Sequence, residues 1–97
     1  MKSIICHAIT DRRVLSVYYD GGSRLIEPFC YGVSTKGNEV LRAYQVEGYS
    51  SSGNASGWKL FDVSLISSVD ITEKTFNGDR SFYNPNDKAM IKIFCHI

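Results

Sequence analysis

Charged and aromatic side chains alternate with small apolar ones near the middle of the chain. If residues 39–46 form a strand, Leu41 and Ala43 lie on one face, and Arg42 and Tyr44 lie on the other. A guanidinium supplies charge for a phosphate, and an aromatic ring supplies a flat partner for a base. We therefore expect Arg42 and Tyr44 to belong to a ligand-binding surface. The alternative is that both side chains only pack along their strand.

Catalytic chemistry has little support in the sequence. The carboxylates between Asp20 and Asp79 form no pair with the spacing of an acid/base dyad, and His7 and His96 have no clear nucleophile partner. Cys30, beside a tyrosine in an apolar stretch, has the setting of a buried thiol rather than an activated one. We expect no enzymatic activity and no cofactor.

The three cysteines, Cys6, Cys30 and Cys95, are an odd number and form no Cys-x-x-Cys motif. Free thiols in a reducing compartment are the simplest interpretation. The alternative is a zinc site closed by Cys6-His7 and Cys95-His96. A strand over residues 90–97 directs Cys95 and His96 to opposite faces, so adjacent residues there cannot both ligate one ion. We therefore expect no metal site.

Size and charge limit the function classes. The chain has 97 residues and a formal net charge of +1, which fits one small domain without a general attraction to nucleic acid. No apolar run reaches the roughly 18 residues of a membrane span, and the N-terminal segment turns polar too early for a signal peptide. We therefore expect a cytoplasmic protein that does not act on membranes.

The pattern of residues predicts a mainly β fold with a short N-terminal helix. Residues 1–12 have a helical apolar stripe, and residues 13–75 contain five short strands separated by glycine-rich turns. Pro28 lacks a backbone donor, which predicts an edge or a bulge at that point of its strand. Five short strands joined by tight turns are typical of a small barrel. Residues 49–57, rich in serine and glycine, should form a surface loop.

The order of these elements resembles the WYL domain, a family built as a small Sm-like (SH3-like) barrel. The likeness covers roughly residues 5–75. The family's helix and the basic-aromatic strand after it correspond here to Ala8 to Tyr19, and its Glu-Pro element corresponds to Ile26-Glu27-Pro28. The family is named for a Trp-Tyr-Leu tripeptide on a strand that ends in Ala-Tyr, and the end of that strand corresponds to Leu41-Arg42-Ala43-Tyr44. Its tryptophan strand and the turn after it correspond to Trp58-Lys59-Leu60-Phe61 and to residues 62–66.

The resemblance implies a sensor or regulatory domain that binds nucleotides or nucleic acid, often in transcription regulation. If the barrel closes as in the family, further side chains join Arg42 and Tyr44 in the ligand site: Arg13, Arg24, Trp58 and Lys59. Trp58 would serve there as a stacking platform, the alternative being a packing role. Asp62 and Leu65 replace two arginines of the family, which removes two phosphate contacts.

Residues 76–97 extend beyond the likeness. Turn-forming clusters at Asn77-Gly78 and at residues 84–87 precede an alternating strand from Met90, one face of which is wholly apolar. That face must cover either its own barrel or a neighbouring chain. The extension therefore predicts a second function class, a protein-interaction module or homodimer that works by β-strand pairing through the barrel edge or the C-terminal strand.

Overall fold

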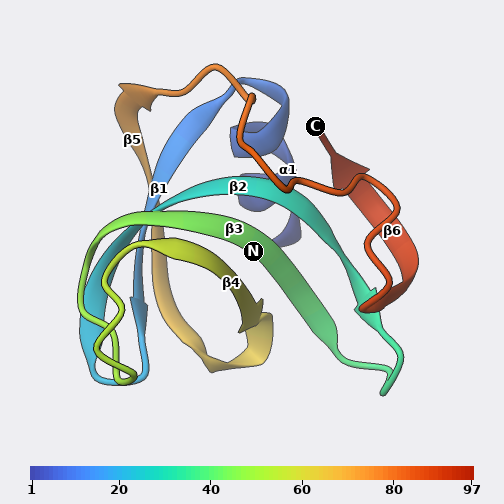
Figure 1. Ribbon diagram of the computed structural model, residues 1–97, viewed down its shortest axis with the longest axis horizontal. Coiled ribbons are helices and arrows are strands. Elements are labelled where there is room, and N and C mark those ends of the chain that lie inside the picture. The colour runs from blue at the N-terminus through green and yellow to red at the C-terminus, as the bar shows by residue number, and fades with distance from the viewer.

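The computed structural model describes all residues 1–97 and contains one α-helix, six strands and one short 3₁₀ turn (Figure 1). The elements follow the chain as α1 (Lys2–Thr10), β1 (Arg13–Tyr19), β2 (Gly22–Ser34), β3 (Glu39–Gly48), β4 (Gly57–Asp62), η1 (Val63–Leu65), β5 (Ile66–Thr75) and β6 (Met90–His96). The predicted mainly β fold with a short N-terminal helix is confirmed. No helix in the structure is both long and apolar enough to cross a membrane.

The strands form one antiparallel sheet in the order β4-β3-β2-β1-β5, with β6 as an additional partner of β2. The expectation of a closed barrel is wrong, whereas the five strands expected over residues 13–75 and the strand expected at the C-terminus are present. β4 pairs only with β3 and β5 only with β1, so the sheet curves without closing. The sixth strand, β6, joins the sheet because β2 has 13 residues and extends beyond the end of β1. The second half of β2 therefore pairs with β6.

The bulge predicted at Pro28 is present. The register between β2 and β3 shifts between Pro28 and Cys30, so Phe29 is the extra residue. Phe29 is fully buried and packs against aromatic rings from β4 and from the C-terminal segment. The missing donor of Pro28 thus falls where the ladder is already interrupted, which explains how a proline lies inside a central strand.

The main core lies on the concave face of the curved sheet. Leu41 and Ala43 contribute to it from β3, as the alternation predicts, and α1 adds Ile5, Ala8 and Ile9. The helix packs against β1, β2, β5 and β6. Burial of these apolar side chains, at roughly 25 cal/mol per Å², stabilises the packing of the helix against the sheet.

The cysteines do not follow the expectation of three free thiols. Cys6 in α1 and Cys95 in β6 form a disulfide, with their Cα atoms 5.7 Å apart. The helix and the last strand are neighbours because both pack on β2, which brings residues 89 positions apart into bonding range. Cys30 is the one free thiol, and burial raises its pKa to about 11. The disulfide also consumes both thiolates that a zinc site would need.

The C-terminal extension packs on its own chain. Residues 76–89, called the tail below, leave β5 and run across the molecule to β6 (Figure 1). β6 then pairs with β2 from Cys30 opposite His96 to Ser34 opposite Met90. Of the apolar face predicted for the last strand, Ile93, Cys95 and Ile97 pack partly against the core of the same molecule, whereas Ile91 is 69% exposed.

Candidate functional site

The convex face of β2, β3 and β4, called the outer face below, carries the polar and aromatic residues that the alternation places opposite the core. Five of its side chains contact the tail: Glu27, Phe29, Arg42, Tyr44 and Trp58. Three of the five are predicted ligand residues. The tail thus lies on the surface that the sequence assigns to a ligand.

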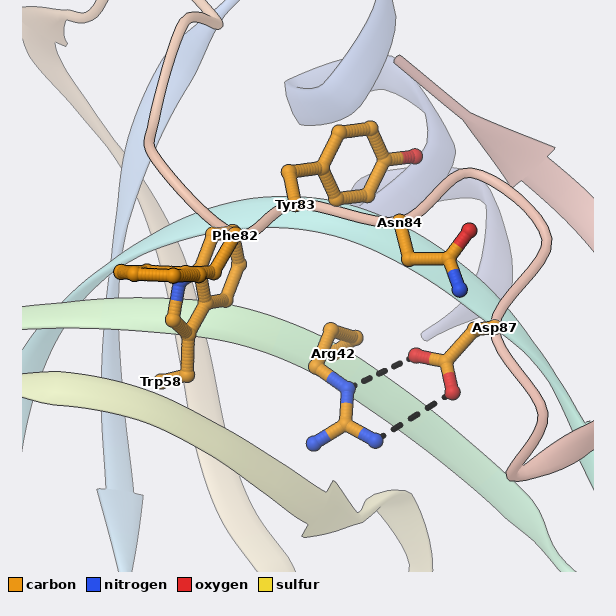
Figure 2. Close-up of a pocket in the computed structure, with 6 residues that line it drawn as sticks. All are labelled: Arg42, Trp58, Phe82, Tyr83, Asn84 and Asp87. Atoms are coloured by element: carbon orange, nitrogen blue, oxygen red, sulfur yellow. Dashed lines mark hydrogen bonds and ion pairs between the residues drawn. The ribbon is translucent and has the colours of Figure 1, made fainter.

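Arg42 pairs with Asp87 of the tail. Its Nε donates to Oδ2 at 2.7 Å and its Nη2 donates to Oδ1 at 3.3 Å, a two-pronged arrangement (Figure 2). Asp87 is 9% exposed, and the hydrogen bonds from Arg42 lower the pKa of its carboxyl below the usual range. Asp87 also accepts from the backbone N–H of Ala89, which fixes the turn that leads into β6.

A second ion pair of the same kind lies further along the tail. Arg80 donates from Nε and Nη2 to the two carboxylate oxygens of Glu27, at 2.9 and 3.1 Å. The guanidinium of Arg80 lies 3.9 Å from the centre of the Tyr44 ring. Tyr44 therefore already has a cation on its face, supplied by its own chain.

Between the two ion pairs lies an aromatic cluster. Trp58 stacks with Tyr83 of the tail at a centroid distance of 6.0 Å and meets Phe29 and Tyr44 edge-on at 4.8 and 5.5 Å. Its indole N–H donates to the backbone carbonyl of Ser81 at 2.9 Å. Trp58 thus contacts the tail on both sides of Phe82, at Ser81 and at Tyr83. Burial raises the pKa of Tyr83 to about 12.

Phe82 is the exception in this cluster, because it is 94% exposed. Its backbone has φ of +69°, a conformation that aromatic residues rarely adopt. Phe82 and Trp58 both line two adjoining cavities, of about 230 and 390 Å³. Figure 2 shows the first, which Arg42 and Asp87 border on the side away from Phe82. We call these two cavities together the groove.

The groove carries little net charge, because each of its two arginines is paired with a carboxylate. Asp87 stays ionised at neutral pH since its pKa is lowered, and Tyr83 stays protonated since its pKa is raised. Neither group can exchange a proton near pH 7. What the groove offers a ligand is aromatic surface with polar edges.

The structure separates the six predicted site residues into two groups. Arg42, Tyr44 and Trp58 come together at the groove, whereas the other three lie elsewhere. Arg13 bonds the carbonyl of Thr72 and the carboxylate of Asp11, near the start of β1. Arg24 and Lys59 point to the core side of the sheet, near the loop at residues 49–56.

The sequence interpretation missed six tail residues that line the groove: Arg80, Ser81, Phe82, Tyr83, Asn84 and Asp87. All come from the tail, whose turn-forming residues indicate an irregular path but not its destination. The available signal is the mixture of an arginine, two aromatics and an aspartate within residues 80–87, which lack hydrophobic periodicity. No group of three or more His, Cys, Asp or Glu side chains is arranged to hold a metal ion.

Comparison with protein-family models, with curated proteins and with solved structures finds no match to this chain. The likeness to WYL domains therefore rests on the residues named above.

Proposed function

We propose that this protein is a non-catalytic binding domain, WYL-like and related to Sm-like barrels, whose groove takes the base of a nucleotide or of single-stranded nucleic acid. The observation that carries the proposal is Phe82. The ring of Phe82 is almost wholly in water, so it gains no stability from burial. The positive φ of the Phe82 backbone costs on the order of 1 kcal/mol or more. Strained, exposed side chains of this kind cluster at ligand sites.

The neighbours of Phe82 support a stacking role. Trp58 lines both cavities beside it and is half-buried, so its remaining surface faces the groove. Stacking of a base on aromatic rings contributes about 1–3 kcal/mol per base and tolerates any sequence. Asn84 borders the same cavity and has a side-chain amide that can pair with a base edge (Figure 2).

Phosphates play a smaller part in this proposal. A guanidinium has five N–H donors, and the pair with Asp87 uses two of those on Arg42. The remaining donors can meet one phosphate oxygen, but the carboxylate beside them opposes the charge. We therefore expect binding that weakens only slightly with salt, in contrast to a phosphate-dominated site.

Trp58 makes the test direct, since it is the only tryptophan of the chain. We expect adenosine nucleotides and short oligoadenylates to quench its fluorescence in a saturable way. Phe82→Ala should weaken binding by about 1–3 kcal/mol through the lost stacking partner. Leu65→Ala is the matched control, because Leu65 is a large apolar side chain that is 62% exposed and lies outside the groove.

Two results would overturn the proposal. One is the absence of saturable quenching at millimolar nucleotide and at high oligonucleotide concentration. The other is equal affinity of the Phe82→Ala and Leu65→Ala variants, which would show that the exposed ring takes no part in binding.

Absence of catalysis is part of the proposal, because no nucleophile with a base beside it lies at the groove. Free thiols are one argument for a cytoplasmic protein, and the disulfide between Cys6 and Cys95 removes that argument. A disulfide of this kind persists in oxidising compartments and is rare in the cytosol. If the protein is cytoplasmic, we expect both thiols to be reduced there.

A second candidate function is protein interaction by strand pairing, possible at the sheet's unpaired edges. β6 pairs with β2 along one edge only, so the other edge of the C-terminal strand is open to a partner strand. β4 has one unpaired edge, and Leu60 on it is 39% exposed. A homodimer formed there should persist in high salt, and Leu60→Lys should dissociate it in sedimentation experiments. A wild-type protein that stays monomeric at high concentration excludes this dimer.

A further inference from the structure

One end of the sheet is covered by residues 49–56, the loop that joins β3 to β4. In Figure 1 this loop lies beside the turn between β1 and β2. Tyr49 rests directly on Gly22, where an added Cβ would come within 2.2 Å of the tyrosine side chain. We call this end of the sheet, on its core side, the mouth.

Arg24 lies at the mouth and is 5% exposed. Its Nη2 donates to the carbonyl of Tyr19 at 3.1 Å, and its Nη1 approaches Oε1 of Gln45 at 3.4 Å. Its Nε has no partner and is the only buried side-chain polar atom of the structure left in that state. Buried polar atoms nearly always have a partner, so an orphaned donor points to a group that belongs there.

Aromatic rings surround this guanidinium. Tyr19, Tyr49 and Phe61 lie with their centroids 5.1, 5.6 and 5.7 Å from its central carbon. Rings attract a cation but do not neutralise it. No carboxylate forms an ion pair with Arg24, unlike the arginines of the groove. The structure thus holds a buried positive charge without a counter-ion, which is costly in a protein interior.

A second cation lies at the same end. Lys59 follows the alternation of β4 to the core side, two residues before Phe61, which touches the Arg24 site. Its Nζ donates to the carbonyl of Asn54 at 2.8 Å and to Oγ of Ser50 at 3.3 Å. Ser50 directly follows Tyr49, so one short stretch of loop covers both cations. Lys59 has no carboxylate partner either.

We propose that the mouth is a binding site for a small oxyanion with two negative charges, such as inorganic phosphate or a phosphate monoester. The anion accepts the free Nε–H of Arg24 and replaces the loop oxygens as the partner of Lys59. Tyr49 and residues 50–56 form the lid that moves to admit it. Two cations with several donors match the charge and the oxygens of a phosphate better than those of a single carboxylate.

The lid is suited to this movement. Tyr49 is 45% exposed, and residues 50–56 consist mainly of serine and glycine in exposed positions. The loop is held by few bonds, among them Tyr49 N–H to the carbonyl of Ser23 and the amide of Gln45 to the carbonyl of Tyr49. Few contacts and an exposed backbone are the features of segments that open locally.

The test is calorimetric titration of the intact protein with inorganic phosphate, at ionic strength held constant with chloride. We expect saturable binding with one site. Lys59→Met should weaken it at least tenfold, whereas Lys74→Met should leave it unchanged, because Lys74 is 67% exposed on β5 and lies outside the mouth. Tyr49→Ala should speed association by opening the lid.

A second readout identifies the atom. Nitrogen-edited NMR resolves arginine Nε–H signals, and the signal lost in Arg24→Lys belongs to Arg24. We expect that signal to shift with phosphate along the same saturation curve. Phe82→Ala should not alter phosphate binding, so this proposal and the groove proposal stand or fall separately.

Three outcomes contradict the proposal. The first is no saturable phosphate binding in either the wild type or Tyr49→Ala. The second is equal phosphate affinity in Lys59→Met and Lys74→Met, which would indicate diffuse attraction to surface charge. The third is an Arg24 Nε–H signal that does not respond while phosphate binds elsewhere.

Discussion

Asp87 and Arg42 hold each other through two hydrogen bonds, with Nε to Oδ2 at 2.7 Å and Nη2 to Oδ1 at 3.3 Å, although 45 residues separate them in the chain. Arg42 is the strongest basic candidate on the outer face, and its partner comes from the tail. The tail therefore both shapes the groove and neutralises the guanidinium that would otherwise dominate it. Loss of either partner should change stability and ligand preference together.

Asp87→Asn should expose this dual role. The amide keeps the shape but not the charge, so the free energy of unfolding should fall by about 1–3 kcal/mol, as measured by urea denaturation. Arg42 is then an unopposed cation, and we expect oligonucleotide affinity to rise and to become more salt-dependent, by about one phosphate contact. Asp79→Asn is the control, because Asp79 is exposed and forms no ion pair. If the oligonucleotide affinity of Asp87→Asn depends on salt concentration as in the wild type, Arg42 does not face the ligand.

The ion pair also predicts a pH dependence. Hydrogen bonds from Arg42 lower the pKa of Asp87 in the folded protein, whereas an unfolded aspartate titrates near about 3.9. The unfolded chain therefore takes up the proton first as the pH falls. The stabilisation is fully present above the unfolded pKa and is lost as pH falls through the folded pKa. Urea titrations of wild type and Asp87→Asn should show a stability gap at pH 7 that shrinks below pH ~4. A gap of constant size would contradict this origin.

The strands could be predicted because their information is local. Alternation places Leu41 and Ala43 in the core and Arg42 on the outer face, and Pro28 marks its own bulge. The tail and the disulfide could not be placed in this way. Their contacts join residues 23 to 89 positions apart, and no local pattern indicates which distant surface a turn-rich segment will meet. The open sheet could not be predicted for a similar reason, because the pairing of β4 with β5 that would close a barrel depends on the path of the whole chain.

The disulfide should be a major contribution to stability. It closes a loop with a sequence separation of 89, for which the chain-entropy model gives roughly 4–5 kcal/mol. A Cys6→Ser, Cys95→Ser double variant should lose about that amount in urea denaturation, and a reducing agent should destabilise the wild type similarly. The double variant provides the control, because the reductant should then have no further effect. Equal stability of oxidised and reduced wild type would show that the bond adds nothing.

Gly32 lies where β2 and β6 leave no room for a side chain. A Cβ at this position would come 2.0 Å from the carbonyl oxygen of Lys92, which is backbone and cannot rotate away. Gly32→Ala should therefore push β6 off β2, lower the free energy of unfolding by about 1–3 kcal/mol and speed hydrogen exchange of the β6 amides. Gly37→Asn is the control for backbone strain without a clash, because an added Cβ there meets nothing within 4 Å and asparagine adopts a positive φ, here +88°, more readily than most residues. If β6 amides exchange at the wild-type rate in Gly32→Ala, the close approach of the two strands is wrong.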